Sequence, residues 1–175
     1  DQAGRAFLAK SSGGVVRIGL DGNDRQEVLH GKGTWQIGAT LSGDRRKLAL
    51  IEAGARSAVL YDLSLRATRK TEMPHPATAL GLSPDGGLLA FGTEEGKVLV
   101  RAPGVDDPRL AFESGTKRIQ SIAWSPDGSH LAVASTDLSI RLHDANTGAV
   151  VRAMEGHPFA RPDMFPIRAM AWSRD

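Results

Sequence analysis

The sequence contains no cysteine, few aromatic residues and no long apolar run. The absence of cysteine excludes disulfides, thiol catalysis and zinc sites built from thiolates. No apolar stretch approaches the roughly 20 residues that a membrane-spanning helix requires, so no membrane partner is expected. Aromatic residues make up only 5% of the chain, whereas glycine occurs 20 times. This balance favours many short strands joined by tight turns over a helical bundle.

Charge of one sign is also scarce, because 22 basic residues are nearly balanced by 20 acidic ones. The longest basic run, Arg45-Arg46-Lys47, is too short to predict a nucleic-acid partner. The chain begins at Asp1 rather than Met, which leaves open a removed leader or a larger parent protein. The compartment stays open, with the cytoplasm favoured. An arginine-rich, lysine-poor and alanine-rich composition hints at a bacterial source.

A repeated turn is the strongest positive signal in the sequence. Four related turns recur at spacings of 41, 42 and 48 residues. A period of about 40–45 residues matches one four-stranded blade of a β-propeller. The flanking segments repeat as well, because 87–93 aligns with 129–135 and 97–101 aligns with 139–143 at the same offset. The four turns begin at Ser42, Ser83, Ser125 and Ser173.

The residues within each repeat predict strands. Large and small side chains alternate with a period of two in 131–134, and both faces are largely apolar, which is typical of a sheet packed between two others. Pro-Asp-Gly turns suit strand connections, and no sustained 3.6-residue apolar stripe predicts a helix. We expect an all-β propeller of four-stranded antiparallel blades, with Leu131, Val133, Ile140 and Leu142 buried. The expected strands are 35–41, 47–52, 57–62, 68–73, 78–82, 88–93, 98–102, 109–112, 119–124, 130–135, 139–144 and 149–154, with three more before residue 30 and one at 167–172.

The chain length corresponds to four blade-equivalents, because the interval from Ser173 through the end and on to Ser42 is 44 residues. Four blades are the low extreme for a propeller. We therefore expect two identical chains to form one eight-bladed ring, ahead of a piece of a longer propeller and a closed four-bladed monomer. The expected units are a partial blade at 1–30, blades at 31–74, 75–114 and 115–156, and a loop insertion with the first strand of a blade at 157–175.

The third complete repeat closely resembles a WD repeat. It carries Ser125-Pro126-Asp127-Gly128, the segment 140–144 and Gly156-His157, and the resemblance extends over nearly the whole chain. This resemblance implies a β-propeller that binds other proteins. The family's closing Trp-Asp dipeptide is replaced by Tyr61-Asp62, Arg101-Ala102 and His143-Asp144 in the three complete repeats.

The same resemblance implies a hydrogen-bonded tetrad of His, Ser or Thr, Asp and Trp in each blade. Glu95 replaces the aspartate in the second complete repeat, and no repeat carries the tryptophan, so each tetrad is incomplete. We therefore expect weaker clamping within the blades than in regular family members. The tetrad-like positions are His75 and His157 for the histidine, Thr93 and Ser135 for the hydroxyl, and Asp137 for the aspartate.

Motifs for catalysis or metal binding are missing from the sequence. The five histidines show no His-x-His or His-Glu-x-x-His spacing, and Asp21-Gly22-Asn23-Asp24 lacks the later glutamate of a calcium loop and is interpreted as a turn. No nucleophile elbow or phosphate-binding glycine loop is present. We expect a non-catalytic protein-interaction scaffold without cofactor or metal. The alternatives are an accessory or gating propeller of a hydrolase and a sensor module of a larger bacterial signalling protein.

A loop insertion at 158–166 largely accounts for the longest repeat spacing. Its aromatic, methionine and arginine side chains are of the types enriched at the cores of protein interfaces. The same side chains equally suit a cover over the rim of the propeller. The candidate interaction residues are Phe159, Arg161, Met164 and Phe165.

If this loop forms a contact surface, changing Phe159 and Phe165 together to Ser should weaken partner binding or self-association, because the apolar contact is lost. The folded monomer should stay nearly intact. Sedimentation velocity measures the association, and a urea melt of the same variant measures folding. Unchanged association, or a collapse of folding, would count against an interface in this loop.

Overall fold

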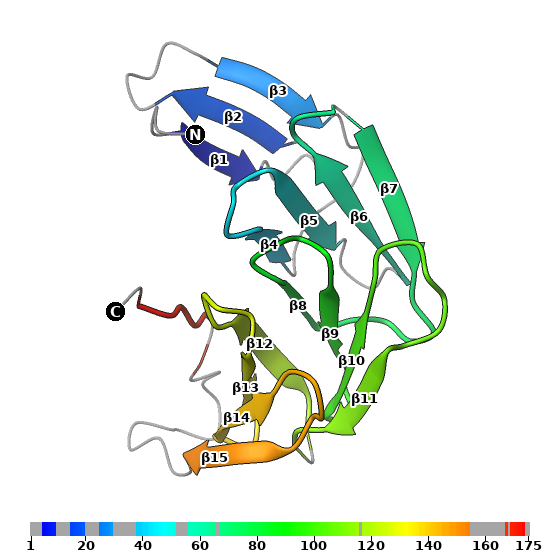
Figure 1. Cartoon of the computed structure of the whole chain (residues 1–175), viewed down its shortest axis with the longest axis vertical. Helices are drawn as coiled ribbons and strands as arrows, with labels where there is room; N and C mark the ends of the chain where they lie inside the picture. The colour runs from blue at the N-terminus through cyan, green and yellow to red at the C-terminus, as the bar shows by residue number, and fades with distance from the viewer. Residues whose placement is uncertain are drawn as a thin grey trace.

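The computed structural model describes residues 38–51, 56–65, 67–115, 117–154, 167 and 169–173, together with the backbone of three strands near the N-terminus. Within these residues, fifteen strands form four antiparallel sheets, and no helix is present. The sheets follow one another along an open arc (Figure 1). The all-β architecture of propeller blades predicted from the repeat is confirmed.

Each sheet keeps its strands in sequence order, so consecutive strands are joined as hairpins. The predicted strands of the three complete blades agree with the observed bounds to within three residues. The first sheet contains β1 (Arg5–Ala9), β2 (Val15–Gly19) and β3 (Arg25–Leu29). The second contains β4 (Gly38–Leu41), β5 (Lys47–Ile51), β6 (Ser57–Asp62) and β7 (Ala67–Glu72). The third contains β8 (Ala79–Leu82), β9 (Leu89–Gly92), β10 (Lys97–Arg101) and β11 (Leu110–Glu113). The fourth contains β12 (Ile119–Trp124), β13 (His130–Ser135), β14 (Ile140–Asp144) and β15 (Val150–Met154).

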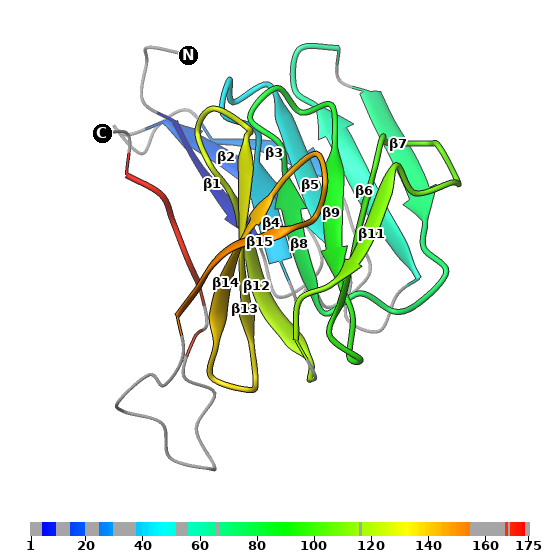
Figure 2. The ribbon, with the colours of Figure 1, turned by 60° about the horizontal axis from the view of Figure 1, so that its bottom comes forward.

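The first strands of the four-stranded sheets lie next to one another, because β8 contacts both β4 and β12. The last strands, β7 and β15, are almost entirely exposed. Figure 2 shows the sheets side by side. Every sheet in the middle of the arc is therefore covered on both faces, which is why its strands are apolar on both faces.

Two apolar clusters join the second, third and fourth sheets. The strands approach so closely that a Cβ on Gly92 would lie 2.5 Å from the Cβ of Ile119, which leaves room only for glycine. One cluster, between the second and third sheets, includes Ile51, Leu60, Leu80, Leu82, Leu89 and Phe91. The other, between the third and fourth sheets, includes Val98, Val100, Ile119, Ile122, Leu131 and Val133.

The prediction for the buried core is half correct. Leu131 is 0% exposed and Val133 is 1% exposed, as expected. Ile140 and Leu142 are only half-buried, so the prediction for them was wrong. The register pairs Ile140 with Ala134 and Leu142 with Ala132. It therefore places Ile140 and Leu142 on the face of the fourth sheet opposite to that of Leu131. No apolar cluster of the described residues covers that face.

The strand predicted at 167–172 is also wrong for the residues described there. Ile167 and residues 169–173 have no strand conformation. Ile167 is buried, and the indole Nε1 of Trp172 donates to the carbonyl oxygen of Ala123 over 3.1 Å. A strand requires a ladder of backbone hydrogen bonds, and in the described residues β12 pairs only with β13 and β1 only with β2. The segment therefore contacts the fourth sheet without joining a ladder.

Replacing Leu131 by Ala should lower the free energy of unfolding by about 2–5 kcal/mol, because it removes a fully buried side chain between two sheets. Val151→Ala is a matched control, since Val151 is 55% exposed on β15, and it should change stability by less than about 0.5 kcal/mol. Urea melts of both variants measure the difference. Equal effects would refute the assignment of the packed face.

Candidate functional site

The repeated turn after the first strand of the three four-stranded sheets is built around one serine and one aspartate. The serine hydroxyl donates to the carboxylate two residues later over 2.5 Å in three blades. Its oxygen accepts the backbone N–H five residues later. The serine bond is the largest cause of the lowered pKa of Asp85 and Asp127, so these carboxylates serve as charged acceptors inside their own turns. The pairs are Ser42–Asp44, Ser83–Asp85 and Ser125–Asp127.

Three different side chains occupy the position at which a WD repeat carries its tryptophan. Tyr61 is 9% exposed and belongs to a small apolar cluster with two leucines of β5. The guanidinium of Arg101 lies 5.3 Å from the centre of the Phe91 ring, and the ring of His143 lies 4.5 Å from that of Phe112. The position therefore remains a packing position without the tryptophan.

Arg101 is a buried cation, with 3% of its surface exposed. Burial lowers the pKa of its guanidinium, and the charges of Asp106 and Glu72 partly offset that effect. Nη1 donates to the carbonyl oxygen of Asp106 over 3.0 Å, while Nε and Nη2 have no hydrogen-bond partner among the described residues. The carbonyl of Asp106 and the ring of Phe91 hold this cation in place. The buried side chain thereby contributes to the packing between the second and third sheets.

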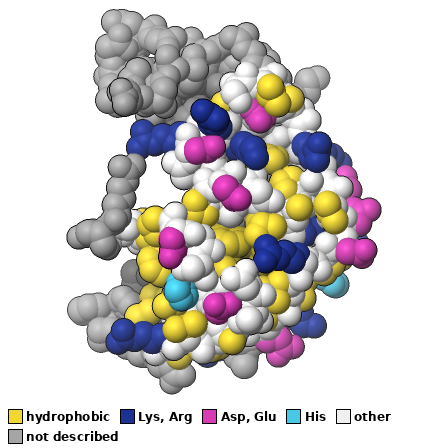
Figure 3. Space-filling view, viewed as in Figure 1, with side chains coloured by type: hydrophobic (Ala, Val, Ile, Leu, Met, Phe, Trp, Pro, Cys, Tyr) yellow, Lys and Arg dark blue, Asp and Glu magenta, His cyan; other side chains and the backbone are white. Residues whose placement is uncertain are grey.

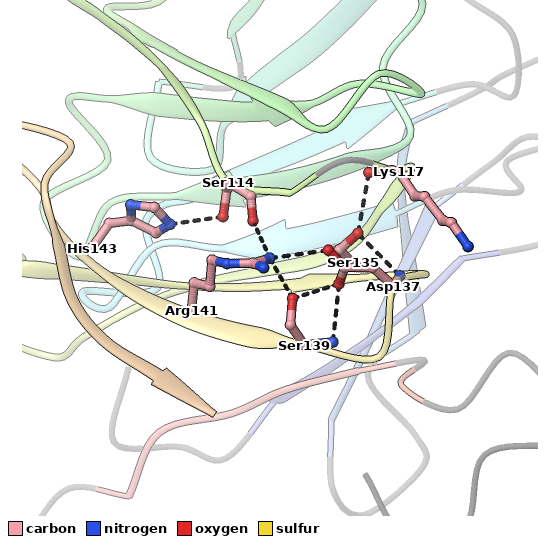
Figure 4. A network of polar contacts seen from close by, with 7 residues as sticks. All are labelled: Ser114, Lys117, Ser135, Asp137, Ser139, Arg141 and His143. Carbon is pink, nitrogen blue, oxygen red and sulfur yellow. Dashed lines mark hydrogen bonds and ion pairs between the residues drawn. The ribbon is translucent and has the colours of Figure 1, made fainter. Parts of the chain in front are cut away.

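Arg141 is the centre of a polar network in the fourth sheet (Figure 4). Its Nη1 donates to Asp137 Oδ2 over 3.1 Å and to the carbonyl oxygen of Ser114 over 2.7 Å, and it also contacts the hydroxyl of Ser139. Burial raises the pKa of Asp137, but the bonds from Ser139 and Arg141 outweigh it, and the pKa is lowered. The ion pair is largely shielded from water, since the two side chains are 21% and 15% exposed.

Ser135 and Asp137 come together within this network, beside a glycine. The backbone N–H of Asp137 donates to the Ser135 hydroxyl over 3.3 Å, and that hydroxyl donates to the carbonyl oxygen of Lys117 over 3.1 Å. A Cβ on Gly115 would lie 3.0 Å from Ser135 Oγ and 3.2 Å from Asp137 Oδ2. Glycine thus fills the place beside the hydroxyl and the carboxylate, and no histidine of the described residues joins them.

His143 closes the network from the other side. Its Nδ1 lies 2.9 Å from the carbonyl oxygen of Gly148, and its Nε2 lies 2.7 Å from the hydroxyl oxygen of Ser114. A carbonyl oxygen can only accept, so Nδ1 carries the proton and the neutral ring accepts the Ser114 hydroxyl at Nε2. Burial lowers the pKa of His143, the bond to Gly148 partly offsets this, and the charge of Arg141 lowers it further.

The remaining tetrad-like residues are grouped around Glu95, whose pKa is lowered by a backbone hydrogen bond, by the Thr93 hydroxyl and by the charge of His75. His75 is exposed and makes no hydrogen bond within the described part of the chain. Thr93 is buried, and its hydroxyl oxygen accepts the backbone N–H of Lys97 over 3.2 Å. Five further candidates are not placed by the structure, and their roles stay predictions. His157 and the candidate interaction residues Phe159, Arg161, Met164 and Phe165 lie outside the described residues.

Sequence reasoning missed Arg141, Ser114 and Gly115. The spacing between Asp137 and Arg141 could have indicated their ion pair, because a tight turn between β13 and β14 brings the two residues to one side. Nothing local in the sequence places Ser114 beside His143, since 29 residues separate them. That contact depends on how the third and fourth sheets stack.

The described part of the chain contains neither a candidate metal site nor a membrane-spanning helix. No group of three or more His, Asp or Glu residues there could hold a metal ion. No helix there is long and apolar enough to cross a membrane.

The buried neutral ring of His143 should make stability depend on pH. Its pKa in the folded chain lies below the ordinary value of 6.5, so as the pH falls through about 6.5 the unfolded chain takes up a proton that the folded chain does not. The free energy of unfolding should therefore decline between pH 7.5 and pH 5. Urea melts of His143→Gln should show a flatter decline, and melts of His75→Gln should keep it. An unchanged decline in His143→Gln would refute the assignment.

The chain is similar in sequence to two longer proteins from mammals. U3 small nucleolar RNA-associated protein 4 homolog of Mus musculus is 28% identical over 163 residues, which cover 88% of this chain and 23% of that protein. Echinoderm microtubule-associated protein-like 2 of Homo sapiens is 33% identical over 73 residues, which cover 42% of this chain and 11% of that protein. The chain thus spans less than a quarter of the length of these relatives.

Comparison of structures and of family models gives the same fold. A chain in the crystal structure of the mitotic checkpoint complex superposes with a TM-score of 0.71 at 14% identity, over 90% of this chain and 50% of that chain. The family model described as the anaphase-promoting complex subunit 4 WD40 domain matches residues 80–175, which is more than half of the chain. The resemblance to WD repeats is thereby confirmed, and the chain belongs to the WD-repeat family of β-propellers.

Proposed function

We propose that this chain is a non-catalytic scaffold that presents the surfaces of a rigid arc of blades to partner proteins. The observation that carries the proposal is the internal use of its polar side chains. Asp85 and Asp127 serve their own turns, and Asp137 and His143 serve the network of the fourth sheet. Groups held in this way stiffen the loops, and stiff loops lower the ordering cost of binding.

The comparisons support protein partners rather than a reaction. One relative is named as a microtubule-associated protein, and the structural neighbour is a chain of a multi-protein complex. The relatives described above are eukaryotic, so the bacterial source and the signalling-sensor alternative have no support from them. The hydrolase-associated alternative likewise has no support in these names. Both alternatives stay predictions.

The proposal includes association through the face of the fourth sheet that carries Ile140, which no apolar cluster of the described residues covers. Ile140 and Leu142 lie on this face, and the register places Met154 beside Ile140. Met154 is 46% exposed, and Trp172 is 38% exposed. Figure 3 shows hydrophobic side chains gathered over the fourth sheet beside the opening of the arc. Exposed apolar faces of this kind promote association.

We propose that the partner on this face is a second copy of the chain. In each copy the complete blade units are residues 31–74, 75–114 and 115–156. The arc is open in Figure 1, with the fourth sheet and the first sheet at its two ends. It superposes on 50% of a longer chain, which supports an arc that forms part of a larger ring. Two arcs would cover each other's end sheets and form such a ring.

Light scattering should report about twice the mass of one chain, and Met154→Lys should shift the population toward the monomer because it places a charge on the face that carries Ile140. Val105→Lys is the matched control, since Val105 is 48% exposed on the third blade, and it should leave the mass unchanged. A folded wild-type monomer that is stable on dilution would defeat the two-chain ring.

A further inference from the structure

A groove between the second and third sheets opens into a cavity of about 370 Å³. It lies where the turn between β6 and β7 meets two turns of the third sheet. Its walls combine apolar and charged side chains. The residues that matter for its chemistry are Lys47, Asp62, Leu65, Arg69, Gly86 and Pro103.

The two cations of the groove are held by backbone carbonyls. The ammonium of Lys47 donates to the carbonyl oxygen of Gly86 over 3.0 Å, and Nη1 of Arg69 donates to that of Pro103 over 3.1 Å. Among the described residues, neither cation forms an ion pair with a carboxylate. Each side chain therefore has N–H donors left over after it has donated to one backbone carbonyl.

The one carboxylate among the described residues that line the groove is already engaged by its own turn. Asp62 Oδ1 accepts the hydroxyl of Ser64 over 2.6 Å and the backbone N–H groups of Ser64 and Leu65, each over 2.9 Å. The bond from the Ser64 hydroxyl is the largest cause of the lowered pKa of Asp62. The described lining thus carries two positive charges and one negative charge, and the negative one is already hydrogen-bonded three times. Lys47 pairs with Asp62 in the register, and its charge helps to lower the pKa of Asp62, Asp44 and Asp85. Arg69 is therefore the cation of the groove with the weaker carboxylate surroundings.

The equivalent groove between the third and fourth sheets is filled by apolar side chains. Leu88 follows Ser83 by five residues, as Lys47 follows Ser42. Leu110 pairs with Val100, as Arg69 pairs with Leu60 on the preceding sheet. Leu88 and Leu110 both pack on the apolar cluster of that interface. The fold therefore accepts leucine at these two positions, so folding alone does not require Lys47 and Arg69.

We propose that this groove binds an extended acidic segment of a partner protein, with a carboxylate against Arg69 and Lys47 and an aliphatic side chain against Leu65. Leu65 is 76% exposed at the groove, which offers an apolar contact beside the cations. A guanidinium suits a carboxylate because it presents several donors in a fixed plane. The inference rests on the proposed scaffold function and names the chemistry of one partner.

The test uses the whole chain and two fluorescein-labelled octapeptides, one with alternating glutamate and leucine and one with glutamine in place of glutamate. Fluorescence anisotropy should show binding of the glutamate peptide and at least about tenfold weaker binding of the glutamine peptide. Arg69→Leu and Lys47→Leu, which copy the neighbouring groove, should each weaken the glutamate peptide by about tenfold. Thermal melts should show that both variants remain folded.

Lys70→Leu is the matched control, because it removes one positive charge from the same strand and Lys70 is paired with Glu72 outside the groove. It should change the affinity by less than about twofold. Equal binding of the two peptides, equal effects of Arg69→Leu and Lys70→Leu, or full displacement by equimolar inorganic phosphate would overturn the proposal. If the wild-type chain self-associates but does not bind the glutamate peptide, the proposal for the groove alone is refuted. If the wild-type chain does neither, the proposed scaffold function is refuted.

Discussion

The packing of one apolar sheet face on another is the interaction on which the rest of this structure depends. A four-stranded sheet whose two faces are both apolar is stable only between two neighbours. The largest fully buried side chains, among them Ile51, Phe91, Leu89 and Leu131, lie in these contacts. Glycine and alanine lie opposite them, and Gly92 lets β9 and β12 approach until no Cβ fits between them. The turns and polar networks act within the geometry that this packing sets.

Polar side chains take over where the packed faces end. The serine–aspartate turns repeat almost unchanged along the chain, because each must close the same hairpin. The residue at the position of the missing tryptophan varies from Tyr61 to Arg101 to His143, and each is buried. Different side chains fit there because aromatic rings and backbone carbonyls are both available as partners. Repeats that share a core can therefore differ in surface chemistry, and the contrast between the two interblade grooves is one outcome of that freedom.

The same requirement for two covered faces explains the ends of the arc. The fourth sheet buries Leu131 and Val133 against the third sheet but leaves Ile140 and Leu142 half-buried on its other side. An alternating strand carries apolar residues for both neighbours whether or not the second neighbour is present. The proposed association through this face and the proposed recognition at a groove are thus separate consequences of the repeated blade. The first would arise at the last blade of the arc, and the second would arise between two blades in its middle.

The sequence by itself determined the repeat, the blade, the strand bounds and the Ser-Pro-Asp-Gly turns, because each depends on residues close together in the chain. It also identified Leu131 and Val133 as core residues, because alternation reveals the faces of a strand. Tertiary structure alone decided which face is covered, and for that reason Ile140 and Leu142 differ from expectation and 167–172 does not form a ladder. It likewise decided that Ser114 meets His143 and that Gly115 stands beside Asp137. These contacts join residues of different sheets, and their distance is set by the stacking of whole blades, which no local pattern encodes.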